Sequence, residues 1–149
     1  MMAATPAIAW AAPPRFLSQK ISDIRIVPGI ETLLASHLGL LADRRIGLAT
    51  NHTGVDRQGR RDVDLLRAVG VDIRALFAPE HGIAGIAAAG EKVGHGTDIA
   101  TGLPVYSLYG STREPTAEML AGIDMLVFDL QDVCARFYTY PSTLMLILR

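Results

Sequence analysis

The sequence has very little cysteine and no apolar stretch long enough to cross a membrane. Its single cysteine, Cys134, excludes an intramolecular disulfide framework and any metal site built from cysteines alone. No run of apolar residues reaches the roughly 18 residues that a transmembrane helix needs, so we expect no membrane span.

The sequence also lacks an excess of charge of one sign. Fourteen Lys and Arg residues are matched by fifteen Asp and Glu residues, which gives a formal net charge of −1. Because there is neither a basic excess nor a run of Lys and Arg, we expect no nucleic-acid partner. Half of the 149 residues are hydrophobic and 19% are charged, which argues against intrinsic disorder and predicts one domain with a buried core.

The first residues differ in composition from the rest. Met1–Phe16 is rich in Ala and Pro and contains two Ala-x-Ala patterns of the kind that signal peptidase cleaves. No Lys or Arg precedes these patterns, and Pro6 interrupts the apolar stretch. We therefore interpret residues 1–20 as a disordered leader, with the remnant of an export signal as the alternative.

Short apolar segments alternate with helical patterns along residues 21–149. The apolar segments predict strands over residues 45–50, 71–77, 104–108 and 123–130, and the patterns between and around them predict helices over 30–41, 62–69, 115–122 and 136–149. Strands that are apolar throughout are typical of parallel sheets covered on both faces. The sequence thus predicts a Rossmann-like α/β domain with a mostly parallel sheet and flanking helices. A doubly wound sheet usually has five or six strands, so we expect this domain to be truncated.

Polar side chains follow the predicted strands. Asn51 and His52 come after the first strand, Glu80 and His81 after the second, and Asp129 ends the fourth. In open α/β sheets, ligands bind at the carboxyl ends of the strands, so we expect these side chains to share one rim.

The residues of this rim have two interpretations each. Glu80 with His81 is either a general acid or base pair on a rigid strand end or part of a polar loop in which Glu80 caps a helical turn. Asn51 and His52 either bind a sugar hydroxyl or acetamido group or close an Asx-turn. Asp129, at the end of a very apolar strand, is expected to be partly desolvated, so that its pKa can be shifted.

The segment after the fourth strand adds three candidates. Asp132 is more simply explained as a helix cap or an ion-pair partner of Arg136 than as a functional carboxylate. Arg136 is either a clamp for an anionic group or the partner of a neighbouring carboxylate. Tyr138 either stacks on a sugar ring or packs against the edge of the sheet.

Several motifs with a known chemistry are absent. The glycines around His95 do not form a dinucleotide-binding fingerprint, and residues 85–92 have the spacing of a phosphate loop but carry Glu91 where the lysine is needed. Neither the zinc-protease signature HExxH nor the serine-hydrolase signature GxSxG occurs. We expect no cofactor and no metal.

Four segments in order resemble a known family. They are LATNHTGVDRQGR (48–60), LFAPEHGIAG (76–85), TGLPVYSLYG (101–110) and IDMLVFDLQDVCARFYTYPST (123–143). Together they resemble the NamZ-type exo-β-N-acetylmuramidases, a family formerly described as a domain of unknown function. The resemblance implies a Rossmann-like N-terminal catalytic domain and a smaller C-terminal domain, with the active cleft between them.

The resemblance also implies a reaction and a set of residues. The reaction is the release of N-acetylmuramic acid from the non-reducing end of peptidoglycan fragments, which favours the periplasm or the cell exterior over the cytoplasm. Glu80 is the implied catalytic residue, with His81 beside it. The cleft would be lined by residues at matching motif positions: Asn51, His52, Asp129, Gln131, Asp132, Arg136 and Tyr138.

Glycoside hydrolysis usually needs two carboxyl groups, which Glu80 and Asp129 or Asp132 would supply. One departure from the family is Cys134, which stands where we expect a glycine. A non-catalytic module that binds a nucleotide or a sugar, or a decayed remnant without activity, is the alternative function.

Overall fold

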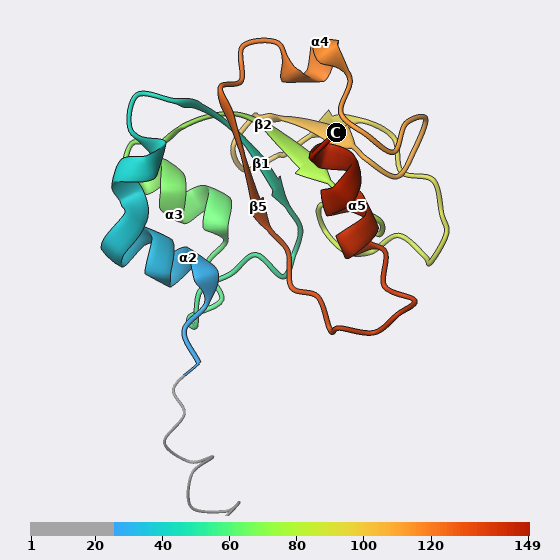
Figure 1. The fold of residues 1–149 in the computed structure, drawn as a ribbon, viewed down its shortest axis with the longest axis horizontal. Helices are drawn as coiled ribbons and strands as arrows, with labels where there is room; N and C mark the ends of the chain where they lie inside the picture. The colour runs from blue at the N-terminus through green and yellow to red at the C-terminus, as the bar shows by residue number, and fades with distance from the viewer. Residues whose placement is uncertain (1–25) are drawn as a thin grey trace, which may run out of the picture.

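The computed structural model describes residues 26–149, so the leader interpreted for residues 1–20 lies outside it (Figure 1). A five-stranded sheet has the order β3-β4-β2-β1-β5. Its strands are β1 (Arg45–Thr50), β2 (Asp72–Ala78), β3 (Gly96–Thr97), β4 (Pro104–Ser107) and β5 (Met125–Asp129). All neighbours pair in parallel except β3, which is antiparallel to β4. The predicted mostly parallel α/β fold is confirmed.

The chain builds the sheet outward in both directions from β1. It adds β2 and then β4 on one side before β5 pairs with the other edge of β1. This reversal of direction puts the topological switch point beside the carboxyl end of β1, where open α/β sheets bind their ligands.

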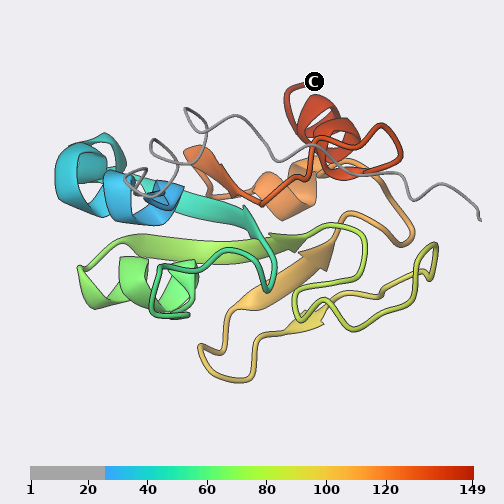
Figure 2. The ribbon, with the colours of Figure 1, turned by 90° about the horizontal axis from the view of Figure 1, so that it is seen from below.

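Helices cover both faces of the sheet. On one face lie α2 (Gly29–Thr32), which continues as a π-helical turn (Leu33–His37) and a 3-10 turn (Leu38–Leu41), and α3 (Asp62–Ala68). On the other lie α4 (Ala117–Leu120) and α5 (Tyr140–Ile147). In both Figure 1 and Figure 2, α2 and α3 lie toward the left of the sheet and α5 toward the right.

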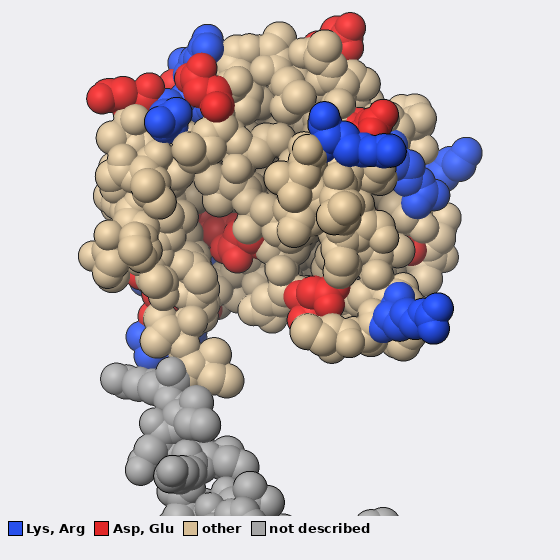
Figure 3. All heavy atoms as spheres, viewed as in Figure 1, with Lys and Arg blue, Asp and Glu red and all other residues tan. Residues whose placement is uncertain are grey.

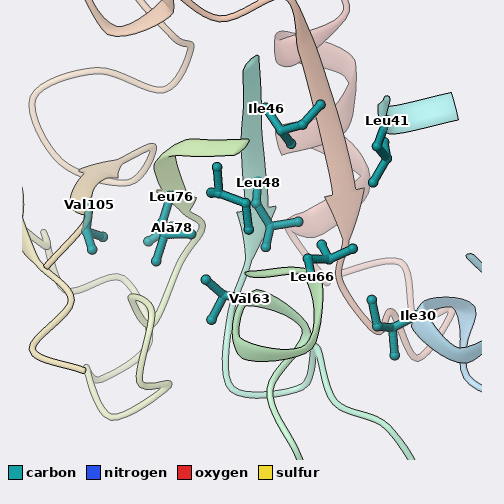
Figure 4. Close-up of a cluster of buried hydrophobic side chains, with 10 residues drawn as sticks. Ile30, Leu41, Ile46, Leu48, Val63, Leu66, Leu76, Ala78 and Val105 are labelled. Atoms are coloured by element: carbon teal, nitrogen blue, oxygen red, sulfur yellow. The ribbon is translucent and has the colours of Figure 1, made fainter. Parts of the chain in front are cut away.

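The alternation of side chains along β1 and β2 produces two cores. On the side of α2 and α3, Ile46 and Leu48 of β1 pack with Leu66 of α3 and with the residues shown in Figure 4. Phe77 of β2, fully buried, belongs to the opposite core together with Met119 of α4. Every residue of β1 after Arg45 is buried, so this strand is buried on both faces, as its apolar sequence predicted.

Two predicted helices differ from the structure. The helix expected over residues 30–41 is a succession of one α, one π and one 3-10 segment, and no side chain caps its first turn. The helix expected over residues 136–149 begins only at Tyr140, with Pro141 in its first turn. Proline is tolerated there because the first N–H groups of a helix have no partner within the helix.

The loop after β1 is fixed by a buried carboxyl group. Asp62, 1% exposed at the start of α3, contacts the Thr50 hydroxyl through Oδ2, and its Oδ1 accepts the Val63 N–H at 2.6 Å. The Asp62 N–H donates to the carbonyl of Gly54 at 2.8 Å. A Cβ at Gly54 would collide with the side chains of Thr50 and Asp62, so only glycine fits this contact.

Gly47 is a position where we expect a substitution to destabilise the fold. A Cβ there would lie 2.5 Å from Leu126 Cδ2 and 2.7 Å from Phe77 Cε2. Gly47→Ala should therefore lower the free energy of unfolding by about 1–3 kcal/mol, measured by denaturant titration. Gly39→Ala is the control, because a Cβ at Gly39 meets nothing within 4 Å. Equal stability of the two variants would contradict the packing described.

Asp62 makes stability depend on pH. Burial, with a smaller contribution from the nearby charge of Asp129, raises the pKa of Asp62 from 3.8 to about 7. The folded state then binds more protons than the unfolded state between these values, so this group makes the protein less stable as pH rises from about 4 to 7. Asp62→Asn, which can keep both contacts, should remove this part of the pH dependence in unfolding experiments.

Asp124→Asn is the matched control for Asp62→Asn. Its hydrogen bonds with Arg45 lower the pKa of Asp124, so its contribution is lost as pH falls rather than as pH rises. If Asp62→Asn left the slope between pH 4 and pH 7 unchanged, the protonation assigned to Asp62 would be wrong.

Candidate functional site

The site expected at the strand ends lies between the end of β2, the loops after β4 and β5, and the start of α5. Here a cavity of about 190 Å³ is lined by Glu80, His81, Ala89, Phe137, Tyr138, Thr139 and Tyr140. Figure 3, in the view of Figure 1, shows acidic atoms in a hollow near β5, on the side of α2. The structure thus brings together three of the predicted residues, namely Glu80, His81 and Tyr138.

Glu80 is a buried carboxylate with donors on both oxygens. Its Oε1 accepts the Gly90 N–H at 2.8 Å, and its Oε2 accepts the Thr139 hydroxyl at 2.6 Å. Burial alone would raise the pKa of Glu80, but hydrogen bonds from Thr139, Gly90 and Tyr109 outweigh it and hold the pKa below its ordinary value. The side chain is therefore an ionised acceptor in the wall of a cavity, and one of its donors, Gly90, belongs to a turn of its own loop.

His81 has an unusual backbone conformation. Its φ is 71°, in the left-handed region that side chains other than glycine rarely adopt. Its Nδ1 lies 2.8 Å from the carbonyl of Ala87. Because a carbonyl can only accept, Nδ1 donates, and in the neutral ring Nε2 is left as an acceptor.

The Asx-turn that the sequence allowed at Asn51 is present. Asn51 Oδ1 accepts the N–H and the hydroxyl of Thr53 at 2.8 and 2.7 Å. Its Nδ2 donates to the hydroxyl of Tyr140 at 2.9 Å. The side chain of Asn51 thereby joins the end of β1 to the first residue of α5.

His52 and Gln131 lie outside the cavity that contains Glu80. His52 is exposed, lies against Gly85, and lines a second cavity of about 200 Å³ together with Asp62. Gln131 is also exposed, and its N–H donates to the Thr53 hydroxyl at 3.2 Å. Neither side chain lines the cavity that contains Glu80.

Asp129 is half-buried at the end of β5, and burial raises its pKa, as its apolar strand predicted. It lines a third cavity, of about 170 Å³, whose other walls include Ile30 and Leu33 on the side of α2. The structure does not bring Asp129 into the cavity of Glu80, because β1 separates the two strand ends.

Asp132 has one satisfied and one unsatisfied oxygen. Its Oδ1 accepts the Cys134 N–H at 2.6 Å, whereas its buried Oδ2 has no hydrogen-bond partner among residues 26–149. Burial is the first cause that raises the pKa of Tyr140, and the charges of Glu80 and Asp132 add to it. Asp132 and Glu80 are therefore both close enough to Tyr140 for their charges to raise its pKa.

The ion pair suggested between Asp132 and Arg136 is absent from the described part of the chain, where Arg136 is exposed and forms no salt bridge. Tyr138 packs edge-to-face on Tyr140, with ring centroids 5.3 Å apart. Cys134 has a φ of 57°, so the position where the family suggested glycine does have the left-handed conformation.

Sequence reasoning missed three residues around the site. Thr139 and Tyr109 are brought to Glu80 only by tertiary contacts, and Asp62 was noted only as a helix start. A hydroxyl residue directly before the helix start at Tyr140-Pro141 was the available signal for Thr139.

Residues 26–149 contain neither a metal-binding cluster nor a membrane-spanning helix. In that range no cluster of three or more His, Cys, Asp or Glu side chains is arranged to hold a metal ion. No helix in the same range has the length and apolarity required to span a membrane.

The chain is similar in sequence to a protein of Bacillus subtilis. It is 46% identical over 137 residues to the peptidoglycan beta-N-acetylmuramidase NamZ of Bacillus subtilis (strain 168), covering 91% of this chain and 33% of that protein. The chain thus spans about a third of the length of this curated relative.

Two solved structures have a similar fold. One DUF1343 family protein of Bacteroides fragilis NCTC 9343 superposes with a TM-score of 0.73 at 47% identity, over 83% of this chain and 30% of that chain. A second protein of that family and organism has a TM-score of 0.66 at 30% identity, over 83% and 31% of the two chains.

The family model described as exo-beta-N-acetylmuramidase NamZ, N-terminal, matches residues 46–149, which include the cavity of Glu80 and the whole sheet except Arg45, the first residue of β1. The chain belongs to this family of NamZ N-terminal domains.

Proposed function

We propose that this chain is the catalytic N-terminal part of an exo-β-N-acetylmuramidase, a glycoside hydrolase that releases N-acetylmuramic acid from the non-reducing end of peptidoglycan fragments. The observation that carries the proposal is Glu80, a buried and ionised carboxylate in a tyrosine-lined cavity at the switch-point edge of the sheet. The 46% identity to a relative named as a peptidoglycan beta-N-acetylmuramidase supports the choice of substrate.

The roles of the carboxyl groups follow from their surroundings. A lowered pKa suits Glu80 to accept a proton from water or to act as a nucleophile, and it does not suit a proton donor. The donor to the leaving oxygen is then a second carboxyl group. Asp132, whose charge acts on Tyr140 together with that of Glu80, is our candidate. Asp129, whose pKa burial raises, lines a different cavity and is the alternative. His81 lies beside Glu80 in the cavity wall.

The remaining rim residues would hold the sugar. Tyr138 offers an aromatic face in the cavity wall, and the exposed Arg136 is a cation for the lactyl carboxylate of muramic acid. His52 and Gln131 are exposed and would contact hydroxyl or acetamido groups, while Asn51 holds the rim in shape through Tyr140.

We further propose that the other part of the full-length enzyme completes the cleft. The matched region is only a third of the Bacillus subtilis relative. Activity is therefore best assayed in a form extended with the C-terminal part of that relative, beside the chain as given.

Glu80→Gln should abolish most of the activity of the extended form on a chromogenic β-N-acetylmuramide. Loss of a catalytic acid or base costs about 10²–10⁴-fold in kcat, and glutamine keeps the size of the side chain without its charge. Glu91→Gln is the control, because Glu91 is exposed on the loop after β2 and bonds only its own turn at Ala88. Normal turnover by Glu80→Gln would overturn the proposed role of Glu80.

Arg136→Gln should weaken the preference for the muramide over the matching β-N-acetylglucosaminide. The two substrates differ by the lactyl carboxylate, and a charge-assisted hydrogen bond is worth about tenfold in KM or more. Arg74→Gln, which removes an exposed arginine paired with Asp72, should leave the preference unchanged. An unaltered ratio of kcat/KM for the two substrates in Arg136→Gln would exclude Arg136 as the lactyl-binding group.

A further inference from the structure

We propose that Thr139 is a positioning residue for Glu80: its hydroxyl fixes the carboxylate as a proton acceptor in the cavity. The inference rests on the proposed function for its meaning in catalysis, but the contact can be tested without any assay of turnover.

Thr139 stands at the N-cap of α5 and does not cap the helix. A threonine at this position usually accepts an N–H of the second or third helical residue through its side-chain oxygen. Here the second helical residue is Pro141, which has no N–H, and no capping hydrogen bond from the Thr139 side chain is present. Its φ and ψ of −92° and −12° also differ from the extended backbone of a usual cap. The hydroxyl instead donates to Glu80 Oε2 at 2.6 Å, 59 residues away in sequence.

The backbone of Thr139 is held in place by its own helix and by β1. The carbonyl of Thr139 accepts the N–H of Thr143 at 3.0 Å and its hydroxyl at 3.3 Å. The next residue, Tyr140, is only 4% exposed and accepts the Asn51 Nδ2–H. A continuous series of contacts therefore runs from the end of β1 through Asn51, Tyr140 and Thr139 to Glu80 after β2.

The other groups around Glu80 explain why the Thr139 hydroxyl matters. Gly90 donates to Oε1, Tyr109 contributes a further hydrogen bond, and His81 lies beside the carboxylate. The Tyr140 hydroxyl faces it from α5. Without Thr139, a buried carboxylate would lose the donor on Oε2, and burial would then favour its protonated form. A protonated Glu80 cannot accept a proton from water.

The first test measures the Glu80 carboxyl group directly by ¹³C NMR titration of this chain. Thr139→Val, which keeps the shape but removes the hydroxyl, should raise the pKa of Glu80, and Thr139→Ser should restore it. Ser142→Ala is the control: it deletes a hydroxyl on α5 at an exposed residue that does not line the Glu80 cavity. If Thr139→Val does not fold, Thr139→Ala makes the same deletion with less bulk.

The second test follows the pH profile of the extended form. Thr139→Val should move the acidic limb of kcat to higher pH and lower kcat by about tenfold at neutral pH with little change in KM, because one charge-assisted hydrogen bond is lost. Thr139→Ser should stay near the unsubstituted protein.

The outcomes separate the two proposals. An unchanged pKa of Glu80 in Thr139→Val, or a Thr139→Ser variant that behaves like Thr139→Val, would overturn the positioning role. A raised pKa of Glu80 together with normal turnover by Glu80→Gln would instead leave the positioning contact standing and refute the proposed function of Glu80.

Discussion

The hydrogen bond from the Asn51 side chain to the Tyr140 hydroxyl joins the central strand to the last helix, and the candidate site depends on it. β1 is buried on both faces and paired on both edges, so the residue that follows it has little freedom. The hydrogen bond from Asn51 fixes Tyr140, the first residue of α5. Tyr138 and Thr139, which directly precede this helix, line the cavity. The long loop after β5 is thus fixed at its end by the strand with the most extensive packing in the sheet.

Burial acts in opposite directions on the carboxyl groups near the switch point. Burial raises the pKa of Asp62 and of Asp129. Glu80 is buried as well, yet donors from three segments of the chain lower its pKa. Glycoside hydrolases use two carboxyl groups with different pKa values, one as the acid and the other as the base. At Asp62 burial outweighs the hydrogen bonds from Thr50 and Val63, whereas at Glu80 the hydrogen bonds outweigh burial.

The two central strands were predictable because their burial is recorded as nearly continuous apolar sequence: residues 45–50 match β1, and 71–77 is shifted from β2 by one residue. The exposed two-residue strand β3 was not predicted, because it lacks this apolar pattern. Strand ends also located Glu80 and Asn51 on one edge of the sheet. The sequence could not show on which side of that edge Asp129 lies, because this depends on the packing of α2 against β5. Thr139 could not be predicted as a partner of Glu80, because a contact across 59 residues depends on where α5 begins.

The strand order bears on the stereochemical course of the proposed reaction. β1 lies between β2 and β5, and adjacent strands are about 4.8 Å apart, so the backbones that carry Glu80 and Asp129 are separated by about 10 Å. Retaining glycosidases place their carboxyl groups about 5 Å apart, whereas inverting enzymes leave about 6.5–9.5 Å for a water molecule. Glu80 and Asp129 line different cavities, so these two carboxyl groups do not face a common cleft among the described residues. Glu80 and Asp132 both act on Tyr140, so they are the pair with shared surroundings. The anomeric configuration of the first product would tell whether the two catalytic carboxyl groups have the retaining or the inverting separation.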